Sequence, residues 1–323
     1  MSVESSSGLV DLKGEFCFSP QMSERLVSPV YVCGAMASGK AALGVSLAKE
    51  LGGEIVNGDV AQAFEGLSRL SGVAHEERRG DVEHHLYGVL GPKVDCDPLA
   101  FRELVVPVIE AIQSRGKVPI VVGGSGVYLK TLTHGPSSIP GRDDALRAKF
   151  EDRSTEDLVE ELKVLDPEGA AGTDLKNRRY VTRGLEICLL SGQKMSALKA
   201  EQAAKFDEIS QSLRGFYLLW DNEEAKQRIS SRSMQTLEKG GIEEVTELRE
   251  VASETCRRTI GFSEIEAHLD GKLTLKECHK ELHTSTRRSA KRQRSWIRKE
   301  AWVKDVICPV AFDQKFARIL GGE

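Results

Sequence analysis

A glycine-rich segment that ends in lysine has the clearest chemical meaning in this sequence. Gly34–Lys40 reads GAMASGK and fits the pattern G-x-x-x-x-G-K between a β-prone run and a helical pattern. Its glycines let the backbone curl so that successive N–H groups face an anion, and the helix N-terminus that follows adds partial positive charge. Lys40 would supply a point charge to the terminal phosphates. The alternative is a glycine-containing turn with a surface lysine.

This context favours a P-loop that binds a di- or triphosphate. The predicted phosphate-binding residues are Gly34, Ala35, Met36, Ala37, Ser38, Gly39, Lys40 and Ala41. Position 41 departs from the usual motif, in which a Ser or Thr hydroxyl ligates Mg²⁺. With alanine there, we expect the cofactor Mg²⁺ to be held mainly through phosphate oxygens and water, and we assign no metal-binding residue.

The elements around this segment predict an α/β fold. Apolar runs at Val30–Cys33, Glu54–Val56 and Val118–Val122 predict short strands. Helical spacing at Lys40–Glu50 and Ala100–Arg115 predicts the helices between them. This alternation is typical of a parallel sheet with crossover helices, here of the P-loop NTPase type.

A change in the sequence pattern after residue 136, from apolar strands to charged helices, predicts an insertion. The sequence becomes helical and charged until an apolar run at Phe216–Trp220 restores a strand, and Glu223–Lys299 is helical again with turns at Gly240–Gly241 and near Gly271. The predicted parts are a flexible N-terminal tail (1–28), a P-loop α/β core with C-terminal helices (29–136 and 215–311) and a helical insertion domain (137–214).

The composition is that of an ordinary globular protein of 323 residues, with 40% hydrophobic and 29% charged residues. A net charge of −4 argues against a protein that is basic overall, but it leaves room for a local nucleic-acid surface. Seven cysteines without a CxxC pair indicate reduced thiols and no zinc site. No apolar run is long enough to span a membrane. We expect a cytoplasmic protein, with mitochondria as the alternative.

Four further stretches narrow the choice among P-loop proteins. They are Asn57–Phe64, Gly123–Tyr128, Arg258–Phe262 and Thr286–Trp296. In this order after the P-loop, they resemble the tRNA dimethylallyltransferase (isopentenyltransferase) family, and the resemblance runs from about Val30 to Lys299. Each motif alone is weak, whereas five in register are specific.

The resemblance implies transfer of a dimethylallyl group from dimethylallyl diphosphate to N6 of the adenine beside the anticodon of tRNA. The leaving pyrophosphate needs a cradle of N–H groups, Lys40 and arginines. The attacking amine must lose a proton, and Asp59 matches the family's catalytic aspartate, which makes it the candidate general base. The alternative for Asp59 is a strand-end aspartate that caps a loop. Ser125 stands where the family has threonine, and Arg228 matches an arginine that we assign to the diphosphate channel.

The same resemblance predicts the surface that binds the tRNA anticodon stem-loop. Arg287–Lys299 contains seven basic residues and no acid, which suits an RNA phosphate backbone, with a nuclear-localisation-like patch or an ordinary basic helix as the alternative. For the insertion arginines the alternative is a solvated helix face. The predicted tRNA-binding residues are Asp59, Gln62, Arg147, Arg179, Arg183, Arg258, Lys291, Arg292, Gln293, Trp296 and Arg298.

The departures from the family pattern lie near the predicted active site. Besides Ala41, Val60 replaces a Ser or Lys, Leu70–Val73 replaces a Gly-Thr-Ala-Lys segment, and Met234 replaces an Asp. Two alternatives therefore stay open: a catalytically weakened paralogue that binds tRNA without prenyl transfer, and an adenylate isopentenyltransferase that acts on free AMP, ADP or ATP. The insertion at 137–214 favours tRNA, because a free nucleotide needs no clamp. A generic P-loop ATPase or kinase is disfavoured. We expect a monomer.

Overall fold

The computed structural model of the protein describes residues 28–73 and 81–307, with side chains up to Val303. The predicted N-terminal tail lies outside this part except for its last residue. The chain forms two compact units, Met1–Leu132 with Leu213–Glu323, and Thr133–Ser212. The second unit begins slightly before the predicted insertion and ends slightly before its predicted end.

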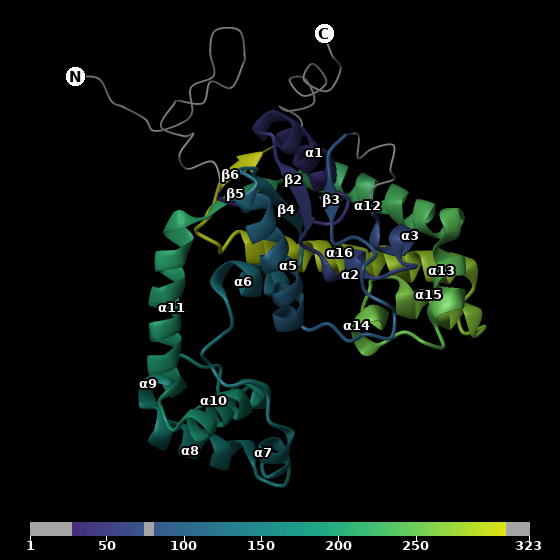
Figure 1. Ribbon diagram of the computed structural model, residues 1–323. Coiled ribbons are helices and arrows are strands. Elements are labelled where there is room, and N and C mark those ends of the chain that lie inside the picture. Colours follow the sequence, from purple (N-terminus) through teal and green to yellow (C-terminus); the bar gives the residue numbers. More distant parts are fainter. Residues whose placement is uncertain (1–27, 74–80, 308–323) are drawn as a thin grey trace. The chain divides into compact units, whose positions relative to one another are not determined.

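The first unit contains a sheet of six strands, all paired in parallel, in the order β3-β2-β4-β1-β5-β6 (Figure 1). The strands are β1 (Val30–Gly34), β2 (Glu54–Asn57), β3 (His84–His85), β4 (Pro119–Gly123), β5 (Arg214–Leu218) and β6 (Val303–Ile307). The predicted α/β class and the three strands predicted before the insertion are confirmed. The strand predicted at Phe216–Trp220 starts and ends two residues too late, because Asp221 caps the next helix.

Helices cover both faces of this sheet. They are α1 (Lys40–Leu51), α5 (Pro98–Ser114) and α6 (Gly126–His134). Val30 and Val32 of β1 pack on the face that carries α1, while Tyr31 and Cys33 face the larger core that includes α5 and α6. Because both faces are buried, the strands appear in the sequence as continuous apolar runs, which explains why they were predictable.

The C-terminal helices follow the predicted pattern of turns. They are α12 (Asn222–Thr236), the π-helical turn η2 (Leu237–Gly241), α13 (Ile242–Leu248), α14 (Glu254–Arg257), α15 (Phe262–Leu269) and α16 (Leu275–Ile297). Gly240 and Gly271 have positive φ angles of 105° and 73°, which confirms both predicted turns. The longest of these helices, α16, packs beside α12 (Figure 1).

A buried carboxylate fixes the first residue of β2. The Glu54 side chain, 1% exposed, accepts hydrogen bonds of 2.7 Å from Lys117 Nζ and Arg115 Nη2 and lies 2.7 Å from His85 Nε2. Burial raises the pKa of Glu54, but these bonds together bring it down to about 2. His85 lies in β3, and Arg115 and Lys117 lie between α5 and β4. The shared Glu54 carboxylate therefore ties β2 to both of these parts of the chain.

The second unit is a small helical domain with its own core. Its helices are α7 (Asp144–Ala148), α8 (Thr155–Leu165), α9 (Pro167–Ala171), α10 (Arg178–Ser191) and α11 (Met195–Ser212). Leu158 and Leu162 of α8 pack against Val181 and Leu185 of α10, all fully buried. The insertion is therefore helical, as predicted.

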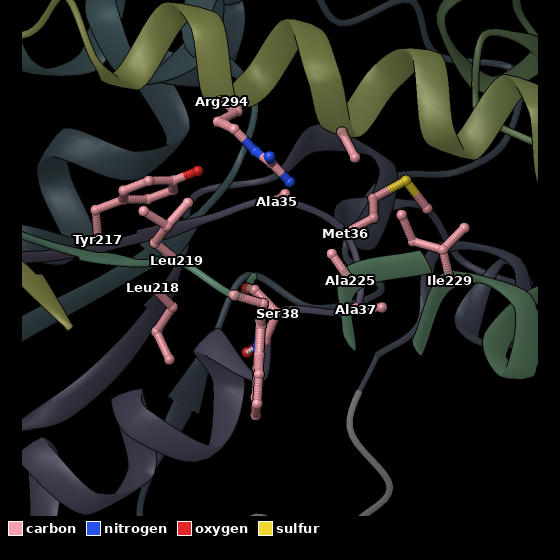
Figure 2. A pocket seen from close by; sticks show the side chains of 12 residues that line it. Ala35, Met36, Ala37, Ser38, Tyr217, Leu218, Leu219, Ala225, Ile229 and Arg294 are labelled. Carbon is pink, nitrogen blue, oxygen red and sulfur yellow. Dashed lines mark hydrogen bonds between the residues drawn. The ribbon is translucent and has the colours of Figure 1, made fainter. Parts of the chain in front are cut away.

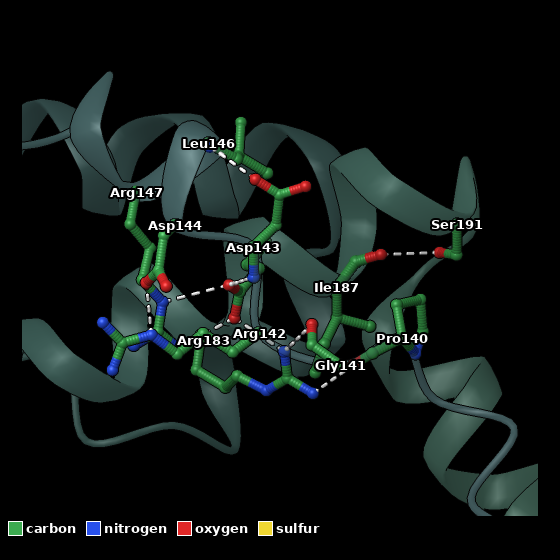
Figure 3. Close-up of polar contacts among 11 residues, drawn as sticks. Pro140, Gly141, Arg142, Asp143, Asp144, Leu146, Arg147, Arg183, Ile187 and Ser191 are labelled. Atoms are coloured by element: carbon green, nitrogen blue, oxygen red, sulfur yellow. Dashed lines mark hydrogen bonds and ion pairs between the residues drawn. The ribbon is translucent and has the colours of Figure 1, made fainter.

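Two of the predicted tRNA-binding arginines, Arg147 and Arg183, bind a buried acid in this domain. Figure 3 shows both side chains, with Arg183 beside Pro140 and Gly141. Glu186 is 0% exposed and accepts bonds from Arg147 Nε (3.0 Å) and Nη2 (2.9 Å), Arg183 Nη1 (2.6 Å) and the Asp143 amide (2.7 Å). Burial raises the pKa of Glu186, but these bonds lower it to about 2. Arg183 also donates to the carbonyls of Pro140 and Gly141. Arg183 and Glu186 therefore fasten the segment that leads into α7, and Arg147 ties α7 itself to α10.

We predict that Glu186→Gln destabilises the insertion at neutral pH by about 1–3 kcal/mol, since two arginines lose their anionic partner. The pKa of Glu186 is about 2 in the folded protein and about 4.3 in the unfolded chain. Its contribution to the free energy of unfolding is therefore complete above about pH 4.3 and is lost as the pH falls to about 2. Over that pH range the variant, which lacks this carboxylate, should lose less stability than the wild type. Urea unfolding followed by circular dichroism measures both effects.

The matched control is Glu160→Gln, because Glu160 forms a pair with Lys163 while 71% exposed. That change should alter the free energy of unfolding by less than about 0.5 kcal/mol. Equal stability of Glu186→Gln and the wild type at neutral pH would contradict a structural role for this ion pair.

Candidate active site

Three predicted site segments follow three neighbouring strands. The P-loop follows β1, Asp59 follows β2 and Ser125 follows β4, and β4 pairs with both β1 and β2. Because parallel strands present their carboxyl ends at one edge, the topology brings these segments together. A side chain at Gly123 would place its Cβ 2.4 Å from the carbonyl oxygen of Gly58, so the β2 and β4 ends are in backbone contact.

The P-loop has the backbone conformation that an anion cradle requires. Gly39 has φ +87° and starts α1, and Ala37 has φ +61°. The left-handed conformation costs a non-glycine residue about 1 kcal/mol, a strain that concentrates at functional loops. The amides of Ala42 and Leu43 donate to the Gly39 carbonyl. Helix geometry leaves the first two amides of α1, at Lys40 and Ala41, without an acceptor within the helix, so a phosphate at this end would accept from them. Ala41 lies in this first turn and offers no hydroxyl.

Three side chains from distant parts of the first unit hold the loop from outside. Trp220 Nε1 donates to the Ser38 carbonyl (2.8 Å), and Arg228 Nε donates to the Ala37 carbonyl (2.9 Å). The Arg228 guanidinium also stacks on the Trp220 ring at 4.2 Å. The amide of Met36 donates to Gln293 Oε1 of α16 (3.1 Å). Arg228, predicted to act in the diphosphate channel, therefore shapes the loop directly.

The electrostatic centre of the site is Asp59 with two cations. Burial lowers the pKa of Lys40, the charge of Asp59 raises it, and Arg232 lowers it further. Burial likewise lowers the pKa of Arg232, and Asp59 opposes this shift. The carboxylate of Asp59 therefore acts on both cations. The sequence prediction missed Arg232, although it lies four residues after Arg228, a spacing that places two side chains on one helix face.

Asp59 is held by its neighbours in a fixed orientation. Its amide donates to Asn57 Oδ1 (2.9 Å), while Asn57 Nδ2 donates to the Leu86 carbonyl (2.8 Å). Asp59 Oδ1 accepts from the Ala61 amide (3.2 Å) and caps the short helix α2 (Val60–Ala63). The capping role considered as an alternative is thus present, but it uses only one oxygen. Within the described residues Oδ2 has no hydrogen-bond partner, although the carboxylate interacts electrostatically with Lys40 and Arg232.

The replaced family segment at Leu70–Val73 is tied to this centre. Gln62 Nε2 donates to the carbonyls of Ser71 (3.3 Å) and Gly72 (3.4 Å), and Arg232 Nη2 donates to the Leu70 carbonyl (3.4 Å). Gly72 has φ +72°, and a Cβ there would lie 1.9 Å from Arg232 Nη2, so a larger residue would strain the backbone and displace the guanidinium. Gln62 therefore positions this segment.

Ser125 lies at the start of α6, half-buried, and its carbonyl accepts from the Leu129 amide (2.9 Å). Its position beside Gly124 places it at the same edge of the sheet as the P-loop, because a Cβ on Gly124 would lie 2.7 Å from the Gly34 carbonyl oxygen. A role for its hydroxyl near the diphosphate stays a prediction.

The predicted tRNA-binding residues fall into two groups. The exposed ones are Arg179, Arg258, Lys291, Arg292 and Arg298, of which Arg258 pairs with Glu254. The others are engaged inside the protein. Arg147 and Arg183 bind Glu186, Gln293 binds the P-loop, and the Trp296 ring fills the space beside Gly126 and packs near Trp302 (6.5 Å between ring centroids). Asp59 and Gln62, the two remaining members, are engaged with α2 and with the carbonyls of Ser71 and Gly72. Contact with tRNA stays a prediction for all of these residues, and Arg258 would first have to leave Glu254.

The P-loop and the Asp59 carboxylate lie at the carboxyl edge of one parallel sheet. This arrangement defines a P-loop α/β protein, in which the loop could bind a phosphorylated substrate and the carboxylate could accept a proton. Comparison with known sequences gives the family. The IPP transferase family model matches residues 62–300, more than half of the chain. The chain therefore belongs to the IPP transferase (tRNA dimethylallyltransferase) family, and the predicted class, a prenyltransferase, is confirmed.

Individual relatives agree with this assignment. A tRNA dimethylallyltransferase of Akkermansia muciniphila is 37% identical over 85% of this chain and 92% of its own length. One from Geobacter metallireducens is 34% identical over 90% and 96%. The solved full-length tRNA isopentenylpyrophosphate transferase of Bacillus halodurans has 30% identity and a TM-score of 0.65, covering 91% of this chain and 94% of that one.

A eukaryotic dimethylallyltransferase, solved while acting on tRNA, has 25% identity and a TM-score of 0.68 over 91% of this chain and 78% of its own. These structures confirm the P-loop NTPase-like fold. Among the described helices, none is both long and apolar enough to cross a membrane.

We predict that Gln293→Leu weakens the binding of inorganic pyrophosphate by about 10-fold, since the Met36 amide loses its acceptor and the loop loses a support. Isothermal titration calorimetry measures this affinity. Gln235→Leu, on the exposed face of α12, should leave it unchanged. A variant that loses affinity for tRNA but keeps full affinity for pyrophosphate would instead support the predicted tRNA contact of Gln293.

Proposed function

We propose that the protein transfers a dimethylallyl group from dimethylallyl diphosphate to N6 of the adenine next to the anticodon of tRNA. The observation that carries the proposal is the Asp59 carboxylate, which interacts electrostatically with Lys40 and Arg232. Asp59 follows β2, its amide is held by Asn57, and β2 is separated from the P-loop strand β1 only by β4. The names of the relatives support tRNA as the acceptor.

In the proposed reaction, the P-loop stabilises the negative charge of the leaving pyrophosphate and Asp59 accepts the proton of the attacking amine. The N6 lone pair attacks C1 of the dimethylallyl group, the C1–O bond breaks, and its electron pair leaves with pyrophosphate. Lys40 and the α1 amides would stabilise that developing charge, and Arg228, which bonds the Ala37 carbonyl, would add positive charge beside the loop. The proton from N6 passes to Asp59 Oδ2, whose partner oxygen keeps the α2 cap. Atoms and charge balance without a further reactant.

The exposed basic face of α16 would bind the anticodon stem-loop. Lys291, Arg292 and Arg298 are exposed, and no acid lies between Arg287 and Lys299. Such contacts to phosphates weaken steeply as salt rises, because binding releases counterions. The protein would act as a monomer, with dimethylallyl diphosphate as the prenyl donor.

Mg²⁺ is the proposed cofactor. No side chain is assigned to it as a ligand, because Asp59 serves as the α2 cap and the proton acceptor. Ala41 contributes none, so phosphate oxygens and water would supply most of the coordination. When bound, the ion would neutralise part of the pyrophosphate charge.

We predict that Asp59→Asn lowers prenyl transfer to tRNA by about 100-fold or more, because an amide cannot accept the N6 proton while its oxygen still caps α2. Incorporation of radiolabelled dimethylallyl diphosphate into unmodified tRNA with an adenine run in the anticodon loop measures this rate. Asp59→Ala should lose activity to the same extent and some stability through the lost cap.

Other outcomes separate the alternatives. Retained labelling in Asp59→Asn would remove Asp59 as the base. A wild-type protein that binds tRNA in a salt-sensitive manner without labelling it would be a non-catalytic paralogue. Labelling of free AMP and not of tRNA would identify an adenylate isopentenyltransferase.

A second prediction concerns Mg²⁺. Ala41→Ser restores a hydroxyl to the first turn of α1, so the Mg²⁺ concentration for half-maximal transfer should fall several-fold. Ala42→Ser, which adds the same group at the exposed neighbouring position, should not change it. An unchanged titration in Ala41→Ser would place the ion away from this turn.

A further inference from the structure

A glutamate of α13 binds the short helix α3 (Ser68–Ser71), which lies far from it in the sequence. Glu244 Oε1 accepts from the Arg69 amide (2.7 Å) and from Ser68 Oγ (3.1 Å), and its Oε2 accepts from the Leu70 amide (2.9 Å). Hydrogen bonds to an ionised acceptor are roughly twice as strong as those between neutral groups. This one carboxylate therefore binds the start of α3 through both of its oxygens.

α3 needs such a partner because it has only four residues. A single helical turn is unstable alone, since it orders several backbone angles for one hydrogen bond. Its first amides have no acceptor within the helix, and a carboxylate at that end stabilises both the amides and the helix dipole. Glu244 supplies the carboxylate, while the Leu70 side chain, 2% exposed, packs in the larger core. We therefore expect α3 to lose its fixed position when the carboxylate is removed.

The far end of α3 contacts the arginine that acts on Asp59. The Leu70 carbonyl accepts from Arg232 Nη2 (3.4 Å), and a Cβ on Gly72 would lie 1.9 Å from the same atom. The guanidinium therefore lies directly against the backbone of this segment. Its charge interacts in turn with the Asp59 carboxylate. A displacement of α3 would therefore free the guanidinium to move relative to Asp59.

Gln62 forms a second connection between α3 and Asp59. It lies in α2, which Asp59 caps, and its Nε2 donates to the carbonyls of Ser71 (3.3 Å) and Gly72 (3.4 Å). These bonds are longer than the bonds of 2.7 and 2.9 Å that the α3 amides make to Glu244. Glu244 therefore holds α3 more firmly than Gln62 does, and α3 in turn supports the groups around Asp59.

The P-loop is supported by other parts of the chain. Among the described residues, those that line the small cavity beside the loop come from the loop itself, from β5 and the residues after it, and from α12 and α16 (Figure 2). None of these lining residues belongs to α3 or α13. Loss of the Glu244 carboxylate should therefore disturb the groups around Asp59 and leave the phosphate site intact.

We propose that Glu244 is a positioning residue for the transfer reaction, which holds α3 and so keeps Arg232 and Gln62 in place around Asp59. This inference rests on the proposed function and extends it to a residue that acts through others. It separates the site into two parts. The P-loop has its own supports, while the surroundings of the base depend on α3 and α13.

Steady-state prenyl transfer to unmodified tRNA, measured on the full chain, tests the proposal. Glu244→Gln should lower kcat by about 10-fold, because glutamine carries no charge and one of its two polar atoms cannot accept from an amide. The KM for dimethylallyl diphosphate and the affinity for inorganic pyrophosphate should stay within about twofold of the wild type. Glu244→Asp, which keeps the charge, should restore part of kcat. Glu243→Gln, the same change at the exposed neighbouring residue of α13, should leave all three quantities unchanged.

Two measurements on the same protein do not require catalysis. Hydrogen–deuterium exchange in the peptide that contains Arg69 and Leu70 should be about 10-fold faster or more in Glu244→Gln, since these amides lose their charged acceptor. It should be unchanged in Glu243→Gln. Urea unfolding of Glu244→Gln, Arg232→Gln and the double variant should give non-additive changes in the free energy of unfolding, because α3 joins the two side chains.

The outcomes separate this inference from the proposed function. Wild-type kcat in Glu244→Gln with faster exchange would overturn the inference and leave the proposed function intact. Equal losses of kcat and pyrophosphate affinity would also overturn it, since they would indicate general destabilisation instead of positioning. Should Glu244→Gln fail to fold, the same comparison is made with Glu244→Asp, whose shorter side chain lengthens the bonds to α3.

A wild type that transfers no prenyl group would refute the proposed function, and the unfolding measurements would then decide the inference. Non-additive changes would support the connection from Glu244 through α3 to Arg232. Additive changes would overturn it, because the two side chains would then act independently.

Discussion

The site depends on hydrogen bonds that hold the backbone of the P-loop in one conformation. Trp220 and Arg228 hold the carbonyls of Ser38 and Ala37 from one side, and Gln293 holds the Met36 amide from the other. A loop fixed in this way leaves the amides at the start of α1 to an anion. Because these three supports come from the segment after β5, from α12 and from α16, the C-terminal third of the chain is needed to shape a motif that lies near the N-terminus.

The same helices connect the phosphate site to the proton acceptor. Arg228 and Arg232 lie one turn apart on α12; the first bonds the P-loop, and the second balances Asp59 and covers Gly72. In the proposed reaction α12 would therefore position both the donor and the base, while the neighbouring ends of β1, β4 and β2 would set their separation. A change in α12 would disturb phosphate binding and proton transfer together, which distinguishes this arrangement from two independent sites.

Much of this architecture could be predicted from the sequence, for a physical reason. Strands buried on both faces leave continuous apolar runs such as Val30–Cys33, and the P-loop carries its own signature. The two-residue strand β3 and the edge strand β6 leave no such run and were not predicted. Arg232 and the role of Glu186 were missed because the sequence does not say which charged side chain on a helix faces inward. Their partners come from other elements, except for Arg183, three residues before Glu186.

The central claim is that this phosphate cradle and Asp59 together prenylate the adenine beside the anticodon. Mass spectrometry of nuclease fragments of an unmodified tRNA, after incubation with the wild-type protein and dimethylallyl diphosphate, tests it most directly. The account predicts one added dimethylallyl group, on that adenosine alone. An unmodified anticodon fragment from a protein that binds both tRNA and pyrophosphate would contradict it.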